Sequence, residues 1–125
     1  MNVLLVDDDD AARLTLQALL EDEGFDVIDA SSSGDALERM RERGFDLVLL
    51  DQHIGDTLGT ELIPEIRLAA PGARVVIVSG STEDAVVGGD AFFPKGGAFP
   101  DLLALVRQLS AVSGGGRIAG NDRPE

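Results

Sequence analysis

Two short apolar segments that end abruptly in aspartate constrain this chain more than any other feature. The first, Val-Leu-Leu-Val, precedes Asp7 and Asp8, and the second, Leu-Val-Leu-Leu, precedes Asp51. Continuous apolar runs of this length are typical of strands buried on both faces, as in a parallel sheet. Ligands bind such sheets beyond the carboxyl ends of the strands, so we expect the three aspartates to meet at one edge. Two carboxylates about 4 Å apart repel by roughly 4 kcal/mol at an effective dielectric constant of 20, which predicts a bound cation, a raised pKa or both.

Length and charge narrow the possible functions. The 125 residues fit one domain with an ordinary hydrophobic core. The net charge of −13 argues against binding to nucleic acid or to an anionic membrane surface. The absence of cysteine excludes disulfides, thiol nucleophiles and thiolate metal sites. We see neither a signal peptide nor an apolar run long enough to span a membrane, so we expect a cytoplasmic protein.

Strands and helices are predicted to alternate along the chain. The predicted strands cover residues 1–6, 25–28, 46–50, 75–78 and 91–93. The predicted helices are 11–22 with Asp10 as its cap, one capped by Ser33 and ended by Gly44, 60–69, and one from Pro100 to about Ser110. Residues 52–59 are expected to form a turn-rich loop. We expect one domain over residues 1–111, followed by a flexible Gly-rich tail or linker over residues 112–125.

This alternation predicts an α/β fold, a parallel sheet with right-handed crossovers and helices on both faces. Four strands then end in polar residues that meet at one edge: Asp7-Asp8, Asp51, Ser79 and Lys95. Phosphoryl transfer to a carboxylate needs a nucleophilic oxygen, a divalent ion and further donors for the transition-state charge. Asp51 can be the nucleophile, Asp7 and Asp8 can help to hold Mg²⁺, and Ser79 and Lys95 can contact the phosphoryl group.

With these residues in this order, the sequence resembles the receiver domain of bacterial two-component response regulators. The resemblance covers Asn2 to about Leu109 and rests on an ordered set of motifs: Val-Asp7-Asp8, Asp-Leu-Val-Leu-Leu-Asp51, Gly59, Val-Ile-Val-Ser79 and Phe92-Phe93-Pro94-Lys95. It implies a flavodoxin-like, doubly wound, five-stranded parallel sheet with strand order 2-1-3-4-5.

The resemblance also implies a role for each site residue. Asp51 would be the phospho-acceptor. Asp8, Asp51 and the backbone carbonyl of His53 would bind Mg²⁺ directly, and Asp7 would bind it through water. Ser79 would be the switch hydroxyl and Lys95 the lysine that contacts the phosphoryl group. Phe92 stands where the family has a rotating aromatic residue.

The sequence departs from the family pattern at three places. Lys95 follows Ser79 by only sixteen positions, so the fourth helix is expected to be shortened or missing. Gly88 and Gly89 lower helix propensity further in that segment. Gly96 follows Lys95 where the family usually has proline with a cis bond, and Gly55 stands where proline is common.

The leading interpretation is a signalling module rather than a metabolic enzyme. It would take a phosphoryl group on Asp51 from a sensor histidine kinase or a phosphotransfer protein, and it could form a homodimer. One alternative is a pseudo-receiver that acts by binding without phosphorylation. Another is a phosphatase resembling the haloacid-dehalogenase superfamily, in which Asp7-x-Asp9 would imitate the Asp-x-Asp motif, but Asp51 would then have no role.

Overall fold

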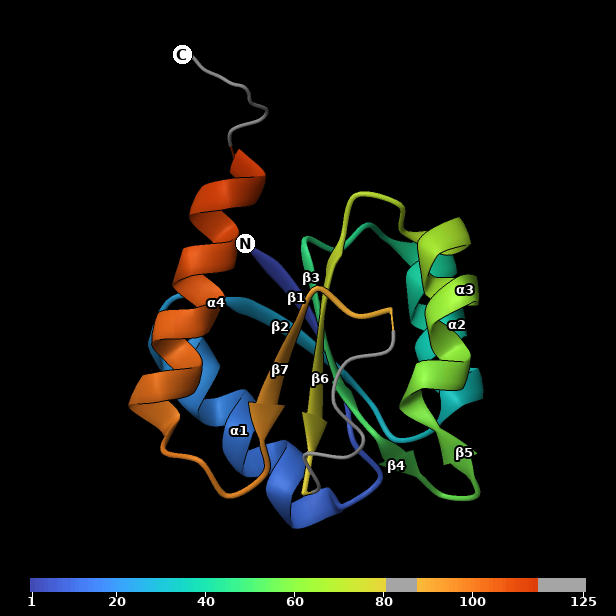
Figure 1. Ribbon diagram of the computed structural model, residues 1–125, viewed down its shortest axis with the longest axis horizontal. Coiled ribbons are helices and arrows are strands. Elements are labelled where there is room, and N and C mark those ends of the chain that lie inside the picture. Colours follow the sequence, from blue (N-terminus) through green and yellow to red (C-terminus); the bar gives the residue numbers. More distant parts are fainter. Residues whose placement is uncertain (81–87, 115–125) are drawn as a thin grey trace.

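The computed structural model describes residues 1–80 and 88–114, which form a central sheet with helices on both faces (Figure 1). The helices are α1 (Asp10–Asp22), α2 (Ser33–Glu42), α3 (Gly59–Ala69) and α4 (Phe99–Gly114). The strands are β1 (Asn2–Val6), β2 (Asp26–Ala30), β3 (Leu47–Asp51), β4 (His53–Ile54), β5 (Thr57–Leu58), β6 (Arg74–Ser79) and β7 (Ala91–Pro94). Within these residues no helix is both long enough and apolar enough to cross a membrane.

The five-stranded sheet has the order β2-β1-β3-β6-β7, and every neighbouring pair is parallel. This order is the predicted 2-1-3-4-5, because β6 and β7 are its fourth and fifth strands. Helices α1 and α4 cover one face of the sheet, and α2 and α3 cover the other (Figure 1). The fold class expected from the alternating pattern is therefore confirmed.

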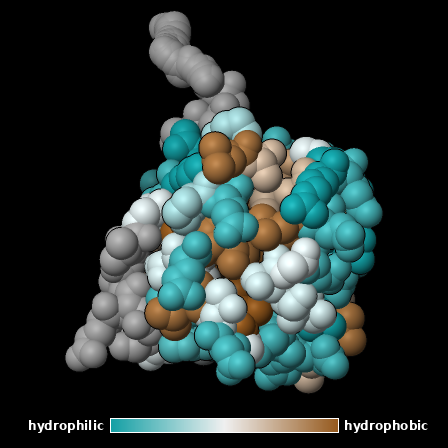
Figure 2. Space-filling model, turned by 90° about the vertical axis from the view of Figure 1, so that its right-hand side faces the viewer, coloured by the Kyte–Doolittle hydropathy of each residue, from teal (hydrophilic) through white to brown (hydrophobic). Residues whose placement is uncertain are grey.

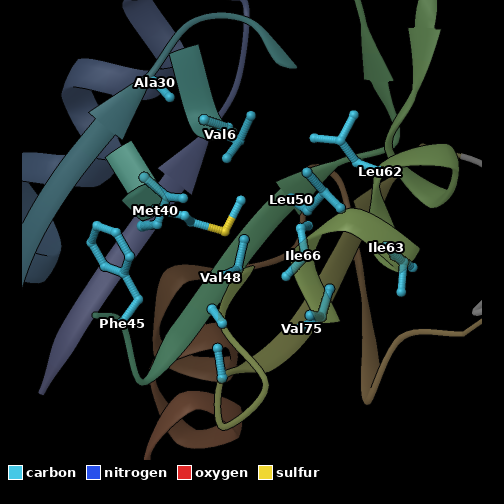
Figure 3. Close-up of a cluster of buried hydrophobic side chains, with 14 of the residues drawn as sticks. Val6, Ala30, Met40, Phe45, Val48, Leu50, Leu62, Ile63, Ile66 and Val75 are labelled. Atoms are coloured by element: carbon cyan, nitrogen blue, oxygen red, sulfur yellow. The ribbon is translucent and has the colours of Figure 1, made fainter. Parts of the chain in front are cut away.

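The alternation of side chains along the central strands divides the core into two clusters. Val6, Val48 and Leu50 pack toward α2 and α3 (Figure 3), whereas Leu5 and Leu49 pack toward α1 and α4. All five residues of β3 are buried, which explains its unbroken apolar run. Each fully buried Leu or Val side chain stabilises the fold by about 1.5–3 kcal/mol.

The outer surface over α2 and α3 is mixed rather than uniformly polar. Figure 2 looks onto this side and shows apolar side chains surrounded by hydrophilic ones. Leu68 of α3 is 85% exposed, the most exposed large apolar side chain among the described residues. A single exposed leucine is ordinary on a soluble domain.

Two predicted helix caps are displaced by one residue. Asp9, and not Asp10, caps α1, because Asp9 has extended backbone angles and its side chain accepts from the Ala12 N–H. Asp10 is already helical and pairs with Arg13. Likewise Ser32, and not Ser33, caps α2 by accepting from the Asp35 N–H. When two candidate caps are adjacent, the backbone conformation decides between them.

One loop and the end of the last helix also differ from the expectation. Residues 52–59 contain the antiparallel hairpin of β4 and β5. Its two-residue turn begins at Gly55, whose φ of +59° is the positive value that type I′ and type II′ hairpin turns both need at that position. The last helix, predicted to end at about Ser110, continues to Gly114.

The family has a further helix between its fourth and fifth strands, here β6 and β7, and the sequence predicts that this helix is shortened or missing. The segment concerned is 81–90, of which residues 81–87 lie outside the described residues. The chain is described again from Gly88, just before β7. Asp90 anchors that return, because its carboxylate accepts from the Val75 N–H at 2.7 Å and from Arg67 at 3.1 Å.

Candidate functional site

Three carboxylates meet at the carboxyl edge of the sheet, the edge toward which the strand arrows point at the bottom of Figure 1. Strands β1 and β3 are parallel neighbours with Val6 opposite Leu50, so Asp7 and Asp51 occupy the same level at the strand ends. Asp7, Asp8 and Asp51 each offer one oxygen, and these oxygens all lie within 4.8 Å of one another. The parallel register thus brings together the three aspartates that the sequence singled out.

Two of these carboxylates are withdrawn from solvent. Asp7 is 8% and Asp51 4% exposed, whereas Asp8 is exposed. Burial raises the pKa of the Asp7 carboxyl, and the nearby Asp51 raises this pKa further. The Asp9 N–H at 2.9 Å and the ammonium of Lys95 act in the opposite direction without cancelling the rise. The charged form of Asp7 is therefore disfavoured while no cation is bound.

The donor set suits a hard divalent cation. All three residues offer carboxylate oxygens, these oxygens already lie within 4.8 Å of one another, and the cluster reaches solvent through Asp8. Mg²⁺ is typically held by one or two carboxylates together with several waters. The cluster therefore fits Mg²⁺, with Asp7, Asp8 and Asp51 as the residues that could hold it.

Lys95 reaches the same cluster from the far side of β6. Its Nζ lies 2.9 Å from Oδ2 of Asp51, and its backbone N–H donates to the carbonyl of Ser79 at 2.8 Å. Partial burial lowers the pKa of Lys95, but the hydrogen bond and charge of Asp51, together with Asp7 and Asp8, outweigh burial and raise it. Lys95 therefore remains an ammonium group at neutral pH.

A tight turn places Lys95. The Gly97 N–H donates to the carbonyl of Pro94 at 3.0 Å, and Gly96 has a φ of +87°. These are the marks of a type II turn with Lys95 and Gly96 as its central residues. No cis peptide bond occurs among the described residues, so the Lys95–Gly96 bond is trans.

The other predicted site residues lie around this centre. Ser79 is the last residue of β6, only 1% exposed, and stands beside Pro94 of β7. His53 begins β4, two residues after Asp51, and is exposed. Phe92 of β7 is half-buried and alternates with Phe93, which is buried in the core toward α1 and α4. The roles assigned to Ser79, His53 and Phe92 stay predictions.

Two glycines that follow β3 support the site, Gly55 in the hairpin turn and Gly59 at the start of α3. The Gly55 N–H donates to Oδ2 of Asp8 at 2.8 Å, so the turn holds the exposed carboxylate in place. A Cβ at Gly59 would collide with the backbone carbonyl of Asp51 and press against Leu50. Gly59 was singled out by the sequence pattern, whereas the contact between Gly55 and Asp8 was not.

Arg13 of α1 was also missed by the sequence analysis. It is buried and donates to the backbone carbonyl of Asp7. The available signal was its position as the one basic residue of this helix, three residues after Asp10.

Comparison with known proteins decides the family. Residues 3–107 match the response regulator receiver domain. This chain belongs to that family. Receiver domains are signalling domains of two-component systems, and this assignment favours the receiver interpretation over the phosphatase alternative.

Relatives of this receiver domain include longer proteins. It is 38% identical over 121 residues to the alginate biosynthesis transcriptional regulatory protein AlgB of Pseudomonas syringae pv. tomato, with 87% of this chain covered. The chain spans only 27% of the length of AlgB.

Solved structures with the same fold include two receivers. A CheY-like receiver domain from Methanospirillum hungatei has 31% identity and a TM-score of 0.84, with coverage of 90% of this chain and 95% of that one. The response regulator TrrA of Thermotoga maritima, solved in complex with Mg²⁺ and beryllofluoride, has 26% identity and a TM-score of 0.79, with coverage of 86% and 97%.

Proposed function

We propose that this receiver domain accepts a phosphoryl group on Asp51 in a Mg²⁺-dependent reaction. The observation that carries the proposal is the environment of Asp51, which lies within 4.8 Å of the oxygens of Asp7 and Asp8 and accepts a hydrogen bond from Lys95. A buried carboxylate with a cation site on one side and an ammonium on the other is suited to attack an electrophilic phosphorus.

The donor would be the phosphorylated histidine of a sensor kinase or phosphotransfer protein. In the transfer, an oxygen of Asp51 forms a bond to phosphorus, the phosphorus–nitrogen bond breaks, and the imidazole leaves. Asp7, Asp8 and Asp51 would hold the cation, which would supply positive charge for the phosphoryl oxygens. Lys95 adds an ammonium beside the same oxygens, and Ser79 would supply a hydroxyl.

We also propose which ion the reaction uses, where in the cell it takes place and what kind of partner takes part. The relative TrrA was solved with Mg²⁺ and beryllofluoride, which supports the choice of Mg²⁺. We propose that the domain acts in the cytoplasm, with a protein partner rather than nucleic acid or membrane, as the net charge of −13 suggests. We also propose that the domain can form a homodimer and that it ends near residue 111.

Phosphorylation by a small donor tests the proposal directly. The protein is incubated with acetyl phosphate and Mg²⁺, and its intact mass is measured. We expect one added phosphoryl group on the wild type and on Asp22→Asn, a control that removes an exposed carboxylate at the end of α1. We expect none on Asp51→Asn. Equal labelling of Asp51→Asn and the wild type would refute the assignment, and no labelling of any protein would favour the pseudo-receiver.

A further inference from the structure

Arg13 is a buried arginine that no part of the proposed phosphoryl transfer uses. Only 8% of this residue is exposed, although arginine is almost never fully buried unless its charge is paired. Its guanidinium donates through all three nitrogens. Nε binds Oδ2 of Asp29 at 2.8 Å, one terminal nitrogen binds the Asp7 carbonyl at 2.9 Å, and the other binds Oδ1 of Asp10 at 2.7 Å.

These three acceptors come from three different elements. Asp29 belongs to β2, Asp10 begins α1, and Asp7 directly follows β1. The carboxylates of Asp29 and Asp10 fix the orientation of the guanidinium, whose remaining terminal nitrogen donates one hydrogen bond to the Asp7 carbonyl. The link therefore ties the end of β1 to both neighbouring elements.

The Asp7 carbonyl belongs to the peptide unit that joins the two acidic residues of the cluster. A peptide unit is planar, so a hydrogen bond to its carbonyl restricts the direction in which the chain enters Asp8. The Asp7 N–H is held as well, because it donates to the carbonyl of Ala30 at 3.1 Å. Both sides of Asp7 are thus fixed by the backbone of β2 and the side chain of Arg13.

We propose that Arg13 is a positioning residue for the cation site, acting through the peptide unit between Asp7 and Asp8. The inference rests on the proposed Mg²⁺ site. Arg13 itself touches no cation, because it offers donors only. Groups that orient metal ligands in this way typically change metal affinity 10- to 100-fold when they are removed.

A purely electrostatic role for Arg13 predicts the opposite sign. Removing a positive charge close to three carboxylates would strengthen their attraction for Mg²⁺. Removing a positioning contact would instead weaken binding, because the two aspartates then sample orientations that do not converge. The direction of the change in Mg²⁺ affinity therefore separates the two roles.

The test is a Mg²⁺ titration of the Arg13→Met protein, which keeps an unbranched apolar side chain but loses the three donors. Mg²⁺ binding is followed through the nuclear magnetic resonance signal of the Gly55 amide, because this amide donates a hydrogen bond to Asp8. We expect the dissociation constant to rise about 10-fold or more. Arg39→Met is the matched control, since Arg39 pairs with two carboxylates of α2, Asp35 and Glu42. Its effect should stay within about twofold, given screening of distant charges by salt.

Two further variants keep the test decisive if Arg13→Met fails to fold. Arg13→Lys retains the charge but cannot bind three acceptors as a planar fork, so it should also weaken Mg²⁺ binding. Asp29→Ala removes one support of the guanidinium and should weaken binding less than Arg13→Met. Its effect should not add to that of Arg13→Lys in the double variant.

The outcomes distinguish this inference from the proposed function. Mg²⁺ affinity equal to or above that of the wild type, in a folded Arg13→Met or Arg13→Lys protein, would overturn the positioning role and leave the metal site standing. Failure of the wild type itself to bind Mg²⁺ would overturn the metal site and the role of Arg13 with it.

Discussion

Asp51 and Lys95 form a hydrogen-bonded ion pair at 2.9 Å although 44 positions separate them in the sequence. Their strands are not neighbours, because β6 lies between β3 and β7 in the sheet. Lys95 therefore crosses the carboxyl end of β6, where its backbone N–H binds the carbonyl of Ser79. This crossing brings the carboxylate of Asp51, the hydroxyl residue Ser79 and the ammonium group of Lys95 to one edge of the sheet.

The raised pKa of Asp7 predicts how the stability of the metal-free protein depends on pH. The folded state holds the Asp7 proton more tightly than the unfolded state, whose Asp pKa is about 3.9. The favourable contribution of the protonated carboxyl is complete below that value and is lost as pH rises through the raised folded pKa. Asp7→Asn should remove this fall and stabilise the metal-free protein at pH 7, since an amide oxygen can still accept from the Asp9 N–H.

Urea unfolding with EDTA, measured from acid to neutral pH, checks this expectation. Asp22→Asn is the control and should keep the pH dependence of the wild type. In the presence of Mg²⁺ the wild type should gain stability by mass action, and Asp7→Asn should gain less. A metal-free Asp7→Asn protein that is less stable than the wild type at pH 7 would contradict the explanation.

The turn at Gly96 should be sensitive to any side chain. Its φ of +87° lies in the region that costs other residues about 1–2 kcal/mol, so Gly96→Ala should lower the free energy of unfolding by about that amount. Gly72→Ala is the matched control, because a Cβ there meets no atom within 4 Å and no positive φ is required. Gly72→Ala should change stability little or raise it slightly.

Denaturant unfolding of both variants measures this difference, and the spectrum of Lys95 shows whether the site has moved. We expect the Lys95 Nζ resonance of Gly96→Ala to lose the shift caused by its bond to Asp51. An unchanged stability and an unchanged Lys95 resonance would show that the turn does not place this side chain.

Replacing each of two helix glycines by alanine should change the stability of the protein in opposite directions. A Cβ at Gly59, in the first turn of α3, would press into the Asp51 carbonyl, and such overpacking typically costs about 1–3 kcal/mol. A Cβ at Gly34, in the first turn of α2, would meet open space, and alanine is the better helix former by about 1 kcal/mol. Thermal unfolding should place Gly59→Ala below and Gly34→Ala above the wild type. Similar melting temperatures for the two variants would contradict the close contact at Gly59.

The sequence by itself predicted the parallel sheet and the aspartates that gather at its edge, and the family resemblance implied the strand order. The apolar runs are local features, and each run carries its terminal aspartate with it, so the convergence of Asp7, Asp8 and Asp51 follows once the strands are parallel neighbours. The order of Ser79 and Lys95 after their strands is equally local. The family resemblance rested on these same residues.

Only the tertiary structure decided how the site is held. Gly55 binds Asp8 across 47 positions, and Arg13 binds Asp29 across 16. The choice of Asp9 over Asp10 as the cap of α1, and the type II turn at Lys95, depended on backbone angles that the residue types allowed but did not specify. Local patterns encode which side chains are apolar and where strands end. Contacts between distant segments depend on the register and distance of packed elements, which become defined only when the sheet and helices assemble.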